Sequence, residues 1–80
     1  MTTNDVVAKR IAQLLRERHC SQYYIEQKSC IFHGSLDHIM RGTNNTIRLD
    51  TLYKIASGFD MTIREFLDDP MFDSETIEYL

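Results

Sequence analysis

The side chains best suited to metal chemistry stand close together in the middle of the chain, at Cys30, His33 and His38. Cys30 and His33 are three residues apart and could share one face of a helix, where a thiolate and an imidazole would meet one zinc ion. His33 and His38 are five residues apart, so they do not stack as an i, i+4 pair does, and no second cysteine lies within two to four residues of Cys30. We therefore expect no metal site.

Nucleophilic and phosphate-transfer chemistry find equally little support. Cys20 follows His19 directly, but no third group is placed to orient the imidazole. The three glycines lie 8 and 16 residues apart, so no glycine-rich phosphate loop exists. A helical chain of 80 residues leaves little room for a substrate cleft. We predict that the protein is not an enzyme and needs no cofactor.

Composition indicates one soluble globular domain, because the 80 residues are 42% hydrophobic and 26% charged with a single proline. Two cysteines are too few for a disulfide framework. No apolar stretch approaches the roughly 18 residues of a membrane span, and the first residues lack the pattern of a secretory signal. We expect a cytoplasmic protein that makes no membrane contact.

The charge is unevenly placed along the chain. Residues 1–59 carry eight basic and five acidic side chains, a net charge of +3, whereas residues 60–80 carry one basic and seven acidic side chains, a net charge of −6. The first three quarters could therefore face a polyanion that the last quarter would repel.

Apolar residues recur at helical spacing, and strand-like alternation is absent. The first stretch predicts a helix from Asp5 to His19, with the charged residues, Arg10 among them, mostly off its apolar stripe. That stripe consists of Val7, Ile11, Leu14 and Leu15. Ser21 is the expected N-cap of a second helix that ends near Ser29.

A third helix is expected to begin near Phe32 and to end at Gly42, a residue suited to the left-handed conformation that terminates helices. Its inward residues are Leu36, Ile39 and Met40. The following stretch from Thr43 to Thr46 favours a turn, because asparagine and threonine side chains compete for backbone hydrogen bonds.

The rest of the chain predicts two further helices and a short extension. The fourth helix ends at Gly58, and its stripe consists of Leu49, Leu52, Tyr53 and Ala56. Thr62 and Glu65 form a capping box for the fifth helix, which carries Ile63, Phe66 and Leu67 and which Pro70 blocks. A last short helix is predicted from Ser74 to Tyr79. The fold class is therefore all-α, a bundle of five to six short helices over residues 5–69, followed by an acidic extension at 70–80.

The segment Ser21-Gln22-Tyr23-Tyr24-Ile25 through Ile31, followed by Leu36, Ile39, Arg41 and Gly42, resembles the helix-turn-helix of the Cro and phage-repressor (XRE-type) family. The run from Leu49 to Ala56, followed by Phe59, Ile63 and the Phe66-Leu67 pair, resembles that family's fourth and fifth helices. The likeness covers roughly residues 7 to 67. It implies a lambda-repressor-like domain that binds duplex DNA as a homodimer and regulates transcription, with repression the expected direction.

The resemblance implies that the third helix enters the major groove and reads base edges there. Its base-reading positions fall on Phe32, His33, Gly34, Asp37 and His38. Phe32 and Gly34 offer apolar contact or close approach, whereas His33 and His38 could donate to guanine. The helix lacks the arginine, glutamine or asparagine that makes bidentate base contacts.

Phosphate contacts are better supplied. Gln22 opens the second helix, where free backbone N–H groups favour an anion, and the family uses a glutamine in this way. The phosphate-binding residues implied by the resemblance are Gln22, Tyr23, Arg41, Thr43, Asn44, Asn45 and Arg48. Tyr23 and Tyr24 are adjacent on one helix, so we expect one of them to pack and the other to be exposed. With few cations the salt dependence of binding should be shallow.

Four positions depart from the family pattern. Glu26 stands where a small alanine is usual, and Cys30 stands where a turn glycine is usual, so Cys30 should adopt a different turn or carry mild strain. Leu15 and Met40 replace a buried Arg–Glu pair together. We predict that these two side chains touch in the core.

The C-terminal residues supply apolar side chains for a homodimer interface, or for folding back on the first or fifth helix. They are Met71, Phe72, Ile77, Tyr79 and Leu80. The acidic tail and the sparse third helix also leave open a protein-interaction module of the same fold, an antitoxin or an adaptor, that does not read DNA.

Overall fold

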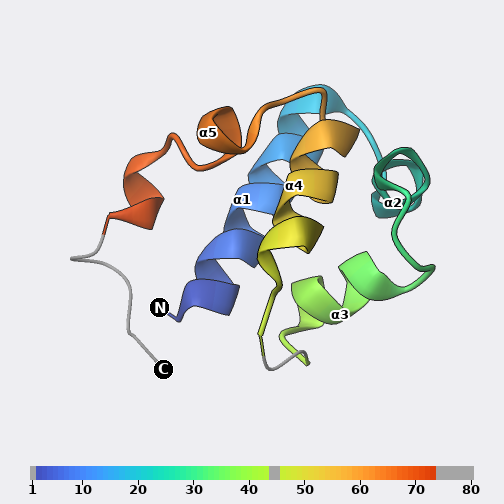
Figure 1. Cartoon of the computed structure of the whole chain (residues 1–80), viewed down its shortest axis with the longest axis horizontal. Coiled ribbons are helices and arrows are strands. Elements are labelled where there is room, and N and C mark those ends of the chain that lie inside the picture. Colours follow the sequence, from blue (N-terminus) through green and yellow to red (C-terminus); the bar gives the residue numbers. More distant parts are fainter. Residues whose placement is uncertain (1, 44–45, 74–80) are drawn as a thin grey trace.

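A computed structural model describes residues 2–43 and 46–73, and the regular structure there is helical (Figure 1). The elements are α1 (Thr3–Arg18), α2 (Gln22–Ser29), α3 (Ser35–Arg41), α4 (Leu49–Gly58) and α5 (Ile63–Phe66), followed by a 3₁₀ turn (Pro70–Phe72). α4 packs against α2 and α5, and α3 packs against α1 and α2. The all-α prediction is confirmed.

The core draws side chains from each of the five α-helices. Its members are Val7, Ile11, Leu14, Ile25, Leu36, Ile39, Ile55, Ala56, Phe59 and Phe66. Leu15 and Met40 are both partly buried and pack against this core, which fits the replacement of a charged pair by two apolar groups. Their direct contact stays a prediction.

Local caps set most helix starts. Ser21 accepts a hydrogen bond from the Tyr24 amide, and the Thr62–Glu65 capping box is present in both directions, as predicted. A second box, between Thr2 and Asp5, starts α1 at Thr3, ahead of the expected Asp5. The backbone N–H of Thr62 lowers the pKa of Glu65, and that of Thr2 lowers the pKa of Asp5, because each hydrogen bond favours the charged carboxylate.

The third helix begins later than predicted. Gly34 has φ = +88° and is the N-cap, so α3 starts at Ser35, three residues after Phe32. The Ser35 amide donates to the Phe32 carbonyl, which closes a turn ahead of the helix. Phe32, His33 and Gly34 therefore belong to the turn between α2 and α3, because a left-handed glycine interrupts the helical backbone there.

Two predicted inward residues of α4 are exposed, Leu49 to 63% and Tyr53 to 54%, and Leu67 after α5 is also exposed. The face of α4 that packs on its neighbours carries Ile55 and Ala56, with Leu52 half-buried. The buried face of α4 is therefore rotated away from Leu49 and Tyr53 toward Ile55.

Gly58 is the last residue of α4, but the left-handed residue that follows the helix is Asp60 (φ = 59°). A Cβ at position 58 would overlap Ser29 Oγ and would lie 3.3 Å from the carbonyl oxygen of Ile25. Glycine is needed there because α2 and α4 approach closely, and not because the helix terminates in a left-handed conformation.

Arg10 is buried, although the sequence placed it off the predicted apolar stripe. It is 7% exposed and donates to the carbonyl oxygens of Phe66 at 2.7 Å and Glu65 at 3.0 Å. It also pairs with Asp69 at 3.6 Å. Arg10 thus joins α1 to the carbonyl end of α5, where helix carbonyls have no intrahelical partner.

The start of the acidic extension turns back onto the bundle, away from α3 (Figure 1). Phe72 is half-buried, packs against the core and lies 6.3 Å from Phe66 between ring centroids. Folding back is therefore confirmed for Phe72, whereas the predicted helix at 74–79, with Ile77, Tyr79 and Leu80, lies outside the described residues.

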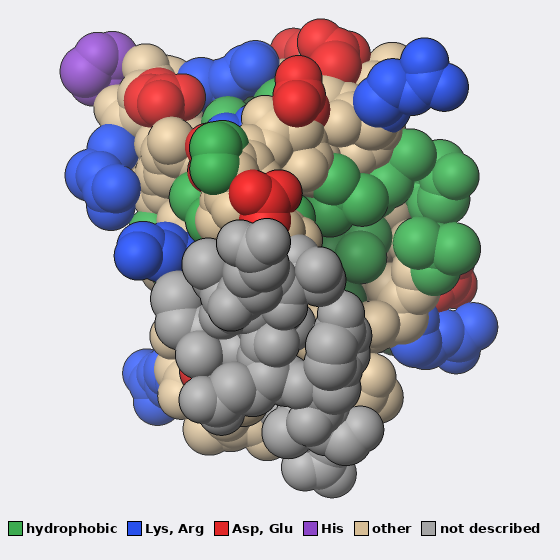
Figure 2. All heavy atoms as spheres, turned by 90° about the vertical axis from the view of Figure 1, so that its left-hand side faces the viewer, with side chains coloured by type: hydrophobic (Ala, Val, Ile, Leu, Met, Phe, Trp, Pro, Cys, Tyr) green, Lys and Arg blue, Asp and Glu red, His purple; other side chains and the backbone are tan. Residues whose placement is uncertain are grey.

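Figure 2 shows basic and acidic side chains interspersed on the side of α5.

None of the described helices is both long and apolar enough to cross a membrane.

Candidate nucleic-acid interface

α3 has one side anchored in the bundle and the other open to solvent. Leu36 and Ile39 are buried, whereas His38 and Arg41 are exposed. We call the open side and the turn before it the α3 surface, defined by Phe32, His33, Asp37, His38 and Arg41. Phe32 is 89% exposed, and so stands clear of the bundle.

Glu26 holds the start of α3 in place. The N-cap Gly34 has no side chain, and Glu26 from α2 substitutes for one: its Oε2 accepts the Leu36 amide at 2.9 Å in a buried hydrogen bond. Glu26 is 5% exposed. The departure from the family's alanine is therefore compensated by an acceptor for a free helix N–H, a role that the sequence reasoning missed. Two features of the sequence could have indicated this role: Glu26 follows the inward residue Ile25, and Gly34, at the start of α3, has no side chain to cap the helix.

Cys30 takes the left-handed conformation that a glycine would take, with φ = 57° and ψ = 38°. Of the two outcomes predicted for Cys30, a different turn or mild strain, the structure therefore shows the strained left-handed conformation. A left-handed non-glycine residue costs about 1 kcal/mol.

His33 is brought between two side chains of α2. Its Nδ1 lies 3.7 Å from Oε1 of Glu26, and its ring meets the ring of Tyr23 edge-on, with centroids 6.1 Å apart. Tyr23, predicted at a phosphate, therefore lies beside a predicted base reader. Tyr24 is also exposed and contacts Lys28, so the expectation that one of the two tyrosines packs is wrong. The inward residues of α2 are Ile25, Glu26 and Ser29.

Two side-chain pairs occupy the rest of the α3 surface. Thr43 Oγ1 lies 2.9 Å from His38 Nδ1 and donates to the His38 carbonyl at 3.3 Å. Arg41 pairs with Asp37 at 3.0 Å, one helical turn apart. Asp37 therefore weakens the attraction of Arg41 for phosphate.

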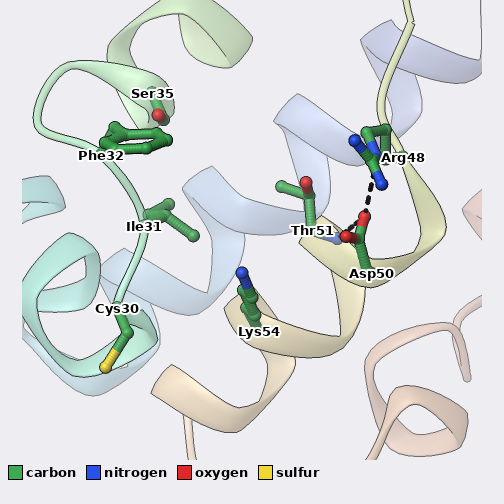
Figure 3. Close-up of a pocket in the computed structure, with 8 residues that line it drawn as sticks. All are labelled: Cys30, Ile31, Phe32, Ser35, Arg48, Asp50, Thr51 and Lys54. Carbon is green, nitrogen blue, oxygen red and sulfur yellow. Dashed lines mark hydrogen bonds and ion pairs between the residues drawn. The ribbon is translucent and has the colours of Figure 1, made fainter.

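A groove of about 400 Å³ separates the α2–α3 turn from the start of α4 (Figure 3). Phe32 and Ser35 lie on one wall, and Arg48 on the other pairs with Asp50 at 3.1 Å. The Lys54 side chain extends into the groove with its ammonium unpaired among the described residues. The sequence analysis did not include Lys54 among the site residues, because no motif distinguishes it from other lysines on a helix surface.

A family model described as the Cro/C1-type HTH DNA-binding domain matches residues 10–70 of the chain. The chain belongs to this family. No curated protein matches the chain.

The remaining residues predicted to bind phosphate in this Cro/C1-type domain differ in their exposure to solvent. Gln22 is the first residue of α2 and is half-buried, whereas Thr43 is exposed. Asn44 and Asn45 lie outside the described residues. The site predictions on these positions stay predictions.

Several cations of the Cro/C1-type domain are already engaged. Arg10 is internal, and Arg18 donates to the Phe59 carbonyl. Lys28 donates to Asp60 at 3.0 Å, a hydrogen bond that raises the pKa of its ammonium and holds it positive. In the described part of the chain, no group of three or more His, Cys, Asp or Glu residues could hold a metal ion.

Proposed function

We propose that this chain regulates transcription, as a repressor, by placing α3 in the major groove of duplex DNA. The observation that carries the proposal is the division of α3 into a buried side, Leu36 and Ile39, and an open side, His38 and Arg41. A helix held in this way fits the major groove, which is about 12 Å wide. In the described part of the chain, the acidic segment packs at α5 instead of covering the open side.

Residues 5–69 form the DNA-binding domain in this proposal, and residues 70–80 the extension. Bases are read from the turn by Phe32, His33 and Gly34, and from α3 by Asp37 and His38. Phosphates are bound at the start of α2 by Gln22 and Tyr23, and beyond α3 by Arg41, Thr43, Asn44, Asn45 and Arg48. The engaged cations support a shallow salt dependence, since its slope scales with the number of phosphates neutralised.

The proposal includes a homodimer formed through the C-terminal region. One α3 surface with few charged readers binds weakly, and two of them about 34 Å apart would read successive major grooves on one face of the duplex. Sedimentation should show a concentration-dependent dimer. A monomer at high micromolar concentration would remove this part of the proposal.

Selection from a pool of random duplexes at moderate salt tests the function. A short palindrome should be enriched, and the affinity of the protein for it should fall as the salt concentration rises. The double variant Gln22→Ala/Arg41→Ala should bind it more weakly. Because Arg41 is exposed, its replacement is expected to leave the fold intact. Glu17→Ala, an exposed change on α1, is the control. Absence of enrichment would sink the proposal and favour the protein-interaction module, whose apolar interface should respond little to salt.

A further inference from the structure

His33 is the one reader on the α3 surface whose ring faces a buried carboxylate. Glu26 uses Oε2 to hold the Leu36 amide and directs Oε1 toward His33 Nδ1, 3.7 Å away, within ion-pair distance. The His33 side chain is 84% exposed, so the opposite ring nitrogen, Nε2, is open to a ligand.

In the proposed complex His33 would lie between the Glu26 carboxylate and the phosphates of the duplex. The His33 ring contacts Glu26 and Tyr23, both from α2. A carboxylate on one side and a polyanion on the other both stabilise an imidazolium, and histidine is the side chain whose charge changes most readily between about pH 5 and 8.

The charge state decides which base His33 can read. A neutral ring with its proton on Nδ1, facing Glu26, offers only an acceptor at Nε2. An imidazolium donates from Nε2, and in the major groove guanine presents two acceptors, N7 and O6.

We infer that His33 reads guanine as an imidazolium and that specific binding therefore takes up a proton at His33, with Glu26 as its positioning residue. The inference rests on the proposed function and deepens it. The proton comes from solvent, forms the N–H bond at His33 and returns to solvent when the complex dissociates.

His38 supplies an internal control, because its Nδ1 faces the neutral hydroxyl of Thr43 and no carboxylate. The same α3 surface thus holds one histidine backed by an anion and one that is not. Replacing each in turn separates proton uptake at His33 from a general effect of histidine near DNA.

The experiment first selects a duplex and then measures its affinity from about pH 6 to about pH 8.5 at constant ionic strength. Wild-type affinity should fall by about tenfold across this range. Calorimetry in buffers of different ionisation enthalpy should show net proton uptake that averages about 0.4 proton per site across this range, the value that a tenfold fall over about 2.5 pH units requires. His33→Gln should flatten the pH profile, whereas His38→Gln should retain it.

Two further changes separate positioning from folding. Glu26→Gln keeps an oxygen for the Leu36 amide but removes the negative charge, so it should flatten the pH profile while thermal unfolding confirms the fold. Replacing single guanines of the selected site by 7-deazaguanine should locate the base, because one replacement should reduce affinity in wild type and not in His33→Gln.

This inference would be overturned if the enriched site were bound with an affinity that does not depend on pH, or if His33→Gln kept the pH dependence of wild type. Either result would leave the proposed function standing. Absence of any enriched site overturns the proposed function, and the inference with it.

Discussion

Glu26 and Leu36 are joined across the α2–α3 turn by a buried hydrogen bond of 2.9 Å between a carboxylate oxygen and a backbone amide. The two residues are ten positions apart, so the start of α3 depends on a side chain of α2. This bond explains how a helix whose N-cap is a glycine can begin at a defined residue.

Glu26→Ala should lower the free energy of unfolding by ~1–3 kcal/mol, because it leaves the Leu36 amide without its partner in a buried site. Glu26→Gln should cost less, since its amide oxygen still accepts. Urea unfolding measures both, with the exposed Glu17→Ala as a control. Equal stabilities of Glu26→Ala and Glu17→Ala would show that the bond contributes nothing.

Arg10→Ala should destabilise the protein by ~3–5 kcal/mol, because Asp69 and the Glu65 and Phe66 carbonyls lose a shared cation. Arg10→Lys should recover little of this lost stability, because a lysine ammonium lacks the planar fork of donors with which arginine reaches both carbonyls. The comparison is Arg16→Ala on the exposed side of the same helix. A loss no larger than that of Arg16→Ala would contradict the role of Arg10 as a link between α1 and α5.

Gly58→Ala should destabilise by ~1–2 kcal/mol despite the better helix propensity of alanine, because its Cβ would overlap Ser29 Oγ. That hydroxyl is buried without a hydrogen-bond partner among the described residues, so Ser29→Ala should be neutral or stabilising by up to ~1 kcal/mol. In a double-mutant cycle, Gly58→Ala should cost less in the Ser29→Ala background. Additive losses would disprove the contact.

Asp37→Asn should strengthen binding to duplex DNA of random sequence several-fold, because this binding needs no base reader and the change removes a negative charge from the α3 surface and releases Arg41. The salt slope should grow by about 0.9, the value for one additional phosphate. Asp68→Asn makes the same charge change beside α5 and should have less effect. Fluorescence anisotropy across a salt series measures both, and equal effects would show that position is irrelevant.

Glu65 should make stability depend on acid pH. Its pKa is lowered in the fold by the Thr62 backbone N–H, so its contribution is complete above the unfolded-state pKa of about 4.3 and is lost as the pH falls through the lower folded value. Glu65→Gln should therefore flatten part of the decline below about pH 4.3. Thermal unfolding across this range tests it, and a decline as steep as in wild type would argue against the capping box as its source.

The features that the sequence alone determined are those made by neighbours along the chain. Ser21, the Thr62–Glu65 box and Gly42 mark helix ends through partners three or four residues away, so residue type and spacing are enough to find them. The helix order and the family resemblance depend on the same local pattern.

The tertiary structure alone decided what depends on partners distant in the sequence. Arg10 is buried because the carbonyl of Phe66, 56 residues later, lies over it, and Glu26 caps α3 because α2 and α3 pack together. Leu49 is apolar yet exposed. Periodicity shows which side chains share a helix face, but the neighbouring element that covers a face, and the polar atoms it brings, are set only when the helices pack.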